Sequence, residues 1–282
     1  MVFRLPEQAA VREELADTPG ARLWYWDTGG GGEPVVLSHP LSQGSAIWAH
    51  QQPVFAAAGY RVVGYSRRGF DRSERGTAED PGTAIGDFCQ LLDALAIDTA
   101  HVIGAAAGGG IAMRLAAAHS ERVSSLVLAG SIVAPVEPDW LEMFARLDIK
   151  AVKPHVSTAF IELGPSYRAS NPEGTARFAA LSAEAHRNHP VDQPSGLELN
   201  WKAMERIRVP VLLLTGEADL YAPLHCSASW LGTCRCTRSR RSEKLDTRPT
   251  GKHPRPSTGL LSISCGGTAG IHRGAELSCG RR

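Results

Sequence analysis

A run of small residues has the spacing of a turn that could hold a reactive side chain. Gly104 and Gly108 stand two residues before and two residues after Ala106, between an apolar stretch and an Ala-rich helical pattern. Glycines at this spacing let a strand and the following helix approach closely while the central residue takes a strained backbone conformation. The N–H groups and the dipole at the start of the helix could stabilise an anionic oxygen. The pattern therefore predicts a turn suited to attack on a carbonyl group.

The central residue of this turn cannot carry out that attack. Ala106 has a methyl side chain, which can neither attack a carbonyl carbon nor be activated by a base. An aspartate nucleophile is excluded for the same reason. Ser66 and Ser131 end other predicted strands and are weak substitutes, because serine is common in such loops. The nucleophile position is therefore vacant.

The elements that must position this turn alternate between strand and helix. Buried-strand patterns occupy residues 22–27, 35–38, 61–65, 100–103, 123–129 and 209–215, and helical spacing occupies 47–58, 85–95 and 110–118. Strands separated by helices imply parallel pairing with right-handed crossovers and helices on both sheet faces. The predicted fold class is α/β, with a mostly parallel sheet.

Residues 131–206 follow a different rhythm, with helical stretches at 140–147, 175–185 and 197–207 separated by prolines. We interpret them as a helical cap inserted into a core made of residues 1–130 and 207–225. Residues 226–282 form a third part, a basic tail.

The tail differs from the rest of the chain in charge, cysteine content and periodicity. Residues 226–282 hold 11 Lys/Arg and 3 Asp/Glu, against 19 and 26 in residues 1–225, and five of the six cysteines. Composition of this kind predicts disorder, because little apolar surface can be buried. The abrupt change after His225 suggests an altered reading frame. We also expect the sheet to end at the strand of residues 209–215, leaving an uncovered edge that favours aggregation.

Several stretches together resemble the α/β-hydrolase superfamily, and within it the capped esterases, carbon–carbon bond hydrolases and 3-oxoadipate enol-lactonases. The matching stretches are residues 35–41, 65–73, 104–108, 122–128 and 209–219. Their order and spacing cover about residues 20–222. The resemblance implies an α/β-hydrolase fold, with an ancestral activity of hydrolysing small esters, lactones or related carbonyl compounds by a Ser-His-Asp mechanism.

The resemblance also implies roles for particular positions. The backbone N–H groups of Leu41 and Ala107 would bind the oxyanion, and Asp219 would be the acid that orients a histidine. The alternative for Asp219 is a turn aspartate that caps the next helix. His253 lies at the expected distance beyond Asp219, but no strand precedes it, and a solvent-exposed loop histidine is the favoured alternative. His272 fits no better, and His39 is expected to shape the oxyanion loop.

Other binding chemistries find little support. Cys234 and Cys236 form a single CxC pair without a second pair, which is a poor zinc signal, and the glycine run lacks the residues of a phosphate-binding loop. We therefore expect no metal and no cofactor. An acidic main body argues against nucleic acid, and no apolar run is long enough to span a membrane. A small-molecule ligand and a cytoplasmic location are expected, with the oligomeric state open.

Three functions remain open. The chain could be a hydrolase with impaired activity, a non-catalytic protein that binds small molecules in the retained site, or a catalyst that needs only an oxyanion hole. Losing a triad can leave roughly 10³ to 10⁴-fold of rate enhancement, so residual activity alone would not separate these functions.

Overall fold

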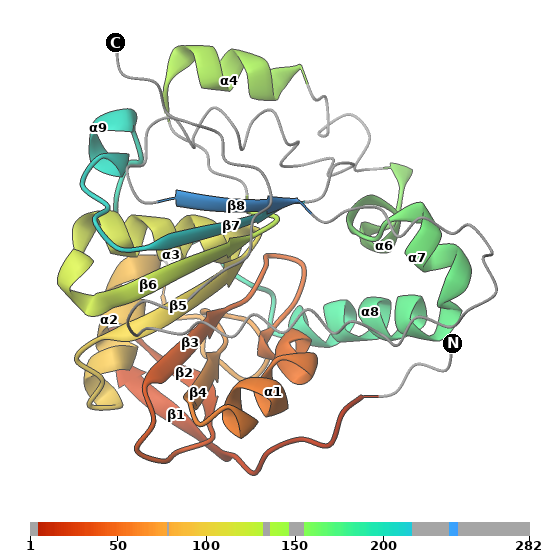
Figure 1. The fold of residues 1–282 in the computed structure, drawn as a ribbon, viewed down its shortest axis with the longest axis horizontal. Helices are drawn as coiled ribbons and strands as arrows, with labels where there is room; N and C mark the ends of the chain where they lie inside the picture. Colours follow the sequence, from red (N-terminus) through yellow and green to blue (C-terminus); the bar gives the residue numbers. More distant parts are fainter. Residues whose placement is uncertain (1–4, 78, 132–135, 147–154, 216–236, 242–282) are drawn as a thin grey trace, which may run out of the picture. The chain divides into compact units, whose positions relative to one another are not determined.

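The computed structural model describes residues 5–77, 79–131, 136–146, 155–215 and 237–241. In this part of the chain an eight-stranded sheet has the order β1-β2-β4-β3-β5-β6-β7-β8 (Figure 1). The strands are β1 Arg12–Thr18, β2 Ala21–Asp27, β3 Pro34–Ser38, β4 Arg61–Tyr65, β5 Ala100–Ala105, β6 Val123–Ala129, β7 Val211–Thr215 and β8 Thr237–Arg241. β1 and β2 pair antiparallel with their neighbours, and the pairs from β4 to β8 are parallel. The predicted α/β class with a mostly parallel sheet is confirmed.

The chain reverses its direction of travel across the sheet at β3. From β3 it passes through η1 (Ser45–His50) and α1 (Gln52–Ala57) to β4 on one side, and then returns through α2 (Ala84–Ala94) to β5 on the other side. Right-handed crossovers in opposite directions place α1 and α2 on opposite faces of the sheet. Between β3 and β5 the loops leave in opposite directions, and open α/β sheets bind their ligands at the carboxyl ends of such strands.

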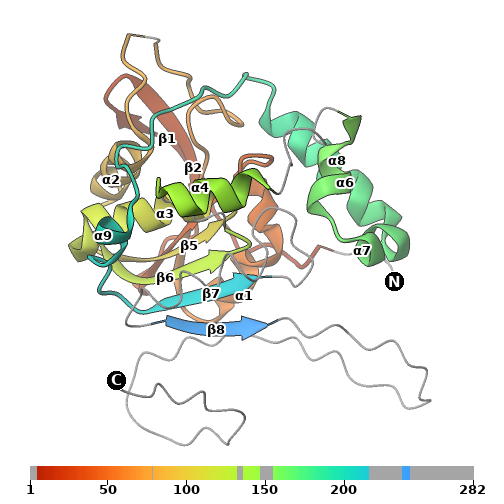
Figure 2. The same ribbon diagram turned by 90° about the horizontal axis from the view of Figure 1, so that it is seen from above.

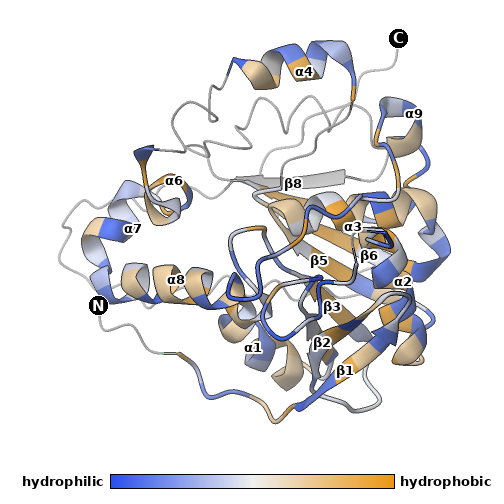
Figure 3. Ribbon diagram, turned by 180° about the vertical axis from the view of Figure 1, so that it is seen from behind, coloured by the Kyte–Doolittle hydropathy of each residue, from blue (hydrophilic) through white to orange (hydrophobic). Residues whose placement is uncertain are grey.

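The core lies between the central strands and the helices α2 and α3 (Ala107–Ala118). Figure 3 shows apolar residues concentrated along β5 and β6. Val36, Val102 and Leu128 on neighbouring strands are fully buried, together with Phe88 of α2 and Met113 of α3. Because both faces of these parallel strands are covered, their sequences are nearly continuous apolar runs.

The helices between β6 and β7 fall into two groups (Figure 2). One group, α4 (Pro138–Ala145) and α9 (Trp201–Met204), is joined by the edge-on rings of Trp140 and Trp201, whose centroids are 6.1 Å apart. Trp140 is buried in the main core, and α9 contacts α3. The other group, α6 (Thr158–Glu162), α7 (Pro165–Ser170) and α8 (Pro172–Ala185), packs mainly on itself. We call this second group the outer lobe.

Two strands were not predicted from the sequence. β1 carries mostly exposed charged residues, so it shows no apolar pattern, but a turn at Gly20 pairs it with β2 along its whole length. β8 pairs with β7 from Thr237 to Arg241. The expectation that the sheet ends at β7 with an uncovered edge is therefore wrong, because backbone hydrogen bonds can extend a sheet with little help from apolar side chains. The predicted disorder of residues 226–282 otherwise falls outside the described residues and stays a prediction.

By internal contacts the chain divides into residues 1–243 and residues 244–282, and the second unit lies outside the described part. None of the helices in the described ranges is long and apolar enough to cross a bilayer.

Candidate active site

The turn between β5 and α3 has the strained geometry that its glycine spacing predicts. Ala106 has φ 46° and ψ −116°, values that a residue with a Cβ atom rarely adopts. Its N–H donates to the carbonyl of Ala129 over 3.0 Å, and its own carbonyl accepts from Gly109 over 3.1 Å. Strain of this kind costs about 1–3 kcal/mol and persists only where the surroundings enforce it.

The glycines around Ala106 allow three segments to meet without side chains between them. A Cβ atom on Gly108 would lie 2.2 Å from the carbonyl oxygen of Ser38 and 2.6 Å from that of His39. A Cβ atom on Gly104 would lie 2.4 Å from the Cα of Gly109. Only glycine permits these approaches, which bring the start of α3 directly against the end of β3.

Two backbone N–H groups at this junction are available to a ligand. In the described part of the chain, neither the Leu41 nor the Ala107 N–H donates to a protein acceptor. Ala107 begins α3, and Leu41 lies three residues past Ser38, whose register partner is Gly104 on β5. Both groups therefore stand at the carboxyl ends of adjacent strands, where open α/β sheets bind ligands.

His39 is buried, and both of its ring nitrogens are engaged. Nδ1 lies 2.8 Å from the carbonyl oxygen of Pro40, and Nε2 accepts the backbone N–H of Arg67 over 3.0 Å. This network assigns the proton to Nδ1 in a neutral ring. Burial, and then the charge of Arg67, holds the pKa of His39 well below its usual range. The ring thus supports the loop and is not free to act as a base.

Arg67 holds the same loop from the other side. Its Nη2 donates to the carbonyl of Pro40 over 2.9 Å and approaches that of His39 at 3.3 Å. The guanidinium also stacks on Phe70, 4.8 Å from the ring centroid. Sequence reasoning missed Arg67, because its partners are backbone carbonyls that no motif records.

The two serines considered as substitute nucleophiles are both engaged elsewhere. The buried hydroxyl of Ser131 lies 3.3 Å from the carbonyls of Gly104 and Ala129. The buried hydroxyl of Ser66 donates to the carboxylate of Asp71. Neither hydroxyl is paired with a histidine in the described residues, so neither forms the nucleophile–base pair that catalysis requires.

Among the described residues a serine–histidine contact does occur, at the opposite end of the parallel strands. His101 Nδ1 lies 2.7 Å from the Ser125 hydroxyl, and Nε2 lies 3.3 Å from the Glu33 carboxylate. His101 is the second residue of β5, and Glu33 directly precedes β3, so this cluster lies at the amino ends of the strands. It is thus separated from Ala106 by the length of β5.

The outer lobe contacts the loops that follow β3 and β4. The Ser42 hydroxyl donates to the Glu162 carboxylate of α6 over 2.5 Å, and Gln43 Nε2 donates to the Phe178 carbonyl of α8 over 3.1 Å. These contacts join the outer lobe to the residues directly after Leu41. No sequence pattern predicts these contacts, because isolated polar loop residues show no periodicity.

The remaining expected site residues are not placed. Asp219, His253, His272, Cys234 and Cys236 lie outside the described residues, so their roles stay predictions. Within the described ranges, no group of three His, Cys, Asp or Glu side chains gathers as a metal site would need.

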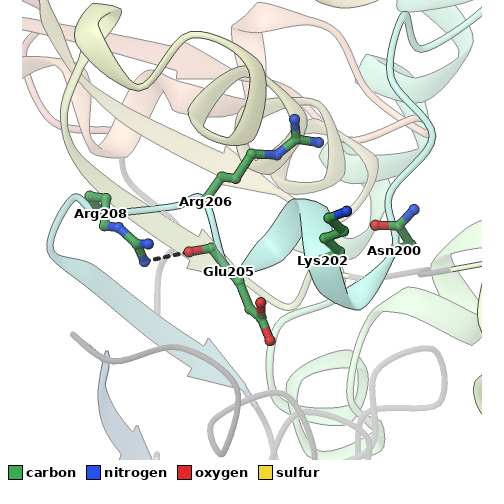
Figure 4. Close-up of a pocket in the computed structure, with 5 residues that line it drawn as sticks. All are labelled: Asn200, Lys202, Glu205, Arg206 and Arg208. Carbon is green, nitrogen blue, oxygen red and sulfur yellow. Dashed lines mark hydrogen bonds between the residues drawn. The ribbon is translucent and has the colours of Figure 1, made fainter.

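A surface hollow of about 440 Å³ lies away from the turn at Ala106 (Figure 4). Its lining is polar and charged, and consists of Asn200, Lys202, Glu205, Arg206 and Arg208. Arg208 lies three residues before the start of β7, so the hollow lies toward the amino ends of the parallel strands. Ligands of such sheets bind at the carboxyl ends of the strands, so the turn at Ala106 is the better candidate for the site.

Comparison with known proteins agrees with this architecture. A family model described as alpha/beta hydrolase fold matches residues 33–244. A protein of Caulobacter sp. (strain K31), provisionally named carbamate hydrolase RutD, is 32% identical over 238 residues, which cover 78% of this chain and 84% of that protein. The 2-hydroxymuconate semialdehyde hydrolase of Pseudomonas sp. (strain CF600) is 32% identical over 222 residues, covering 72% and 77%.

Solved structures show the same fold. The enol-lactonase from Burkholderia xenovorans LB400 superposes with a TM-score of 0.64 at 23% identity, over 82% of this chain and 91% of that chain. A thermophilic esterase from Thermogutta terrifontis gives a TM-score of 0.64 at 20% identity, over 83% and 89%.

Proposed function

Because this chain belongs to the α/β-hydrolase family, we propose that it binds a small ester, lactone or related carbonyl compound at Ala106 without hydrolysing it by nucleophilic attack. The observation that carries the proposal is the backbone of Ala106. Its strained angles, φ 46° and ψ −116°, are those of a turn that presents a side chain to a carbonyl group. The side chain itself is a methyl group, which cannot attack.

The binding half of the proposal rests on the two available N–H groups. The Leu41 and Ala107 N–H groups donate to no acceptor among the described residues and stand at the ends of β3 and β5. Backbone donors do not depend on the residue at position 106, so replacement of the nucleophile leaves them in place. Donors of this kind bind a carbonyl oxygen and stabilise the charge that develops on it.

The names of related proteins support a carbonyl substrate. The relatives and solved structures with this fold include an enol-lactonase, an esterase and a hydrolase of 2-hydroxymuconate semialdehyde. Lactones, esters and semialdehydes all contain a carbonyl group. We infer the same group for the ligand of this chain.

The test combines binding with covalent trapping. The full chain is titrated with a small lactone while its thermal unfolding is followed, and is then incubated with an aryl acetate and analysed by intact mass. We expect a raised Tm with the lactone and no acetyl adduct from the aryl ester. The Ala106→Ser variant restores the hydroxyl but brings no base among the described residues to activate it, so it should acquire no more acetyl than Ala105→Ser, which adds the same hydroxyl one residue earlier.

Two results would overturn the proposal. A covalent acyl intermediate on the unmodified chain would show that another nucleophile acts. A lactone that leaves the Tm unchanged at millimolar concentration would remove the binding role. Turnover without any acyl adduct would instead favour the third function, catalysis by the oxyanion hole alone.

A further inference from the structure

Arg67 is a cation beside the site, and no described residue gives it an anionic partner. Two neighbouring arginines of the same segment pair with carboxylates, Arg61 with Asp27 and Arg68 with Asp87, each over 2.7 Å. Arg67 forms no such pair in the described part of the chain, and its hydrogen bonds go to neutral groups of the loop after β3. No carboxylate among the described residues therefore neutralises its positive charge.

This charge is costly to keep where it lies. Burial lowers the pKa of Arg67 to about 10, a value that still leaves the guanidinium charged at neutral pH. Removing a charge from water without a counter-ion has a large unfavourable free energy, which neutral hydrogen-bond partners offset only in part. An anionic ligand would supply the missing counter-charge.

Arg67 is connected to the proposed ligand position through one peptide group. The Pro40 carbonyl that accepts from Arg67 Nη2 belongs to the same peptide group as the Leu41 N–H. The described backbone contains no cis peptide bonds, and in a trans peptide the C=O and N–H point in opposite directions. Arg67 therefore lies on the carbonyl side of the Pro40–Leu41 peptide, opposite the Leu41 N–H. A donor on the carbonyl side polarises the peptide and strengthens its N–H as a donor.

We infer that Arg67 makes the site at Ala106 selective for anionic ligands, with a carboxylate binding at the Leu41 N–H in preference to the neutral amide of the same shape. This inference rests on the proposed function, because it names the class of ligand for that same site. Arg67 acts through the Pro40–Leu41 peptide and is thus a specificity-determining residue.

The experiment measures selectivity between two ligands of nearly equal size. Butyrate and butyramide are titrated into the full chain by calorimetry, and the ratio of their Kd values is compared among variants. We expect the unmodified chain to prefer butyrate, and Arg67→Gln to reduce that preference at least about tenfold with little change for butyramide. Arg67→Lys should restore part of the preference, because it restores the charge.

Arg114→Gln is the matched control. Arg114 is half-buried and, like Arg67, donates to backbone carbonyls, those of Leu197 and Gly110, each over 3.0 Å. It makes no ion pair in the described residues and lies on α3, away from the loop after β3. The same loss of charge and hydrogen bonds there should leave the butyrate preference unchanged.

The outcomes separate this inference from the proposed function. If the unmodified chain binds neither butyrate nor butyramide while a lactone still raises its Tm, this inference fails and the proposed function stands. If the lactone also leaves the Tm unchanged, the proposed function fails. If the unmodified chain binds butyrate and butyramide equally, or if Arg67→Gln keeps the full preference, the proposed function stands and the role of Arg67 is wrong. Should Arg67→Gln fail to fold, the amide resonance of Leu41 in the unmodified chain decides the matter. It should shift with butyrate, and an unchanged resonance would overturn the inference.

Discussion

The hydroxyl of Ser42 donates to the carboxylate of Glu162 over 2.5 Å, across 120 residues of sequence. Ser42 belongs to the loop that carries Leu41, and Glu162 ends α6 in the outer lobe. A hydrogen bond to a charged acceptor is stronger than one between neutral groups. The position of the outer lobe is therefore coupled to the position of the Leu41 N–H.

A double-mutant cycle with Ser42→Ala and Glu162→Gln tests this coupling. Because Glu162 is exposed, we expect a modest coupling free energy of about 0.5–1 kcal/mol from urea unfolding. The control is the exposed i,i+4 pair of Glu142 in α4 with Arg146, the residue just after α4, which should give no more than about 0.5 kcal/mol. Strictly additive effects of the Ser42 and Glu162 substitutions would contradict the coupling.

Gly108→Ala should destabilise the fold strongly. The new Cβ atom would lie 2.2 Å from the Ser38 carbonyl, and the atom in its way is backbone, which cannot rotate aside. We expect a loss of about 3 kcal/mol or more in the free energy of unfolding. Gly164→Ala provides the comparison, because Gly164 has a φ of −56° and no atom within 4 Å of the added Cβ. Similar Tm values for both variants would show that the close approach is not required.

Ala106→Gly should stabilise the chain. Glycine adopts a positive φ without the Cβ strain of about 1–3 kcal/mol, and this gain exceeds its extra chain entropy of about 0.5–1 kcal/mol. We therefore expect a net increase of roughly 1 kcal/mol in the free energy of unfolding. Ala179→Gly, at an exposed position in α8, should instead lose about 1 kcal/mol. A destabilised Ala106→Gly variant would show that the turn is not strained.

Acidification should weaken the fold through His39. The unfolded chain protonates this ring near its ordinary pKa of about 6.5, whereas burial keeps the native ring neutral at lower pH. The unfolded state then binds more protons, so stability falls as the pH drops below that value, by up to about 1.4 kcal/mol per pH unit. Imidazole ¹⁵N shifts should show a neutral His39 with its proton on Nδ1 at pH 5.5. A ring that titrates near its ordinary value would contradict this expectation.

The sequence was sufficient for the central part of the fold. The strands from β2 to β7 and the helices α2 and α3 follow apolar runs that are long enough to be recognised, because they are buried on both sides or along a full stripe. β1 was not predicted, because five of its seven residues are charged or polar and most of them are exposed. Its place depends on pairing with β2 and not on burial of its own side chains.

The candidate site was predictable only in its backbone. Glycine spacing indicated the strained residue at position 106, since glycine is required wherever two backbones come within van der Waals contact. The side chains that support the site were not predictable. Arg67 binds carbonyl groups, and Ser42 and Gln43 bind residues more than 100 positions away, so their roles exist only once the chain has folded.

The conformation of residue 106 is held by its neighbours and not by its own side chain. Gly104 and Gly108 allow β5, α3 and the end of β3 to lie in close contact. The hydrogen bond from the residue 106 N–H to the Ala129 carbonyl orients the backbone of residue 106. The side chain at this position can therefore be exchanged without rebuilding the turn. Residue 106 is thus a natural attachment point for protein engineering, at which a thiol, a fluorinated probe or an unnatural amino acid would be held in one orientation beside two backbone donors.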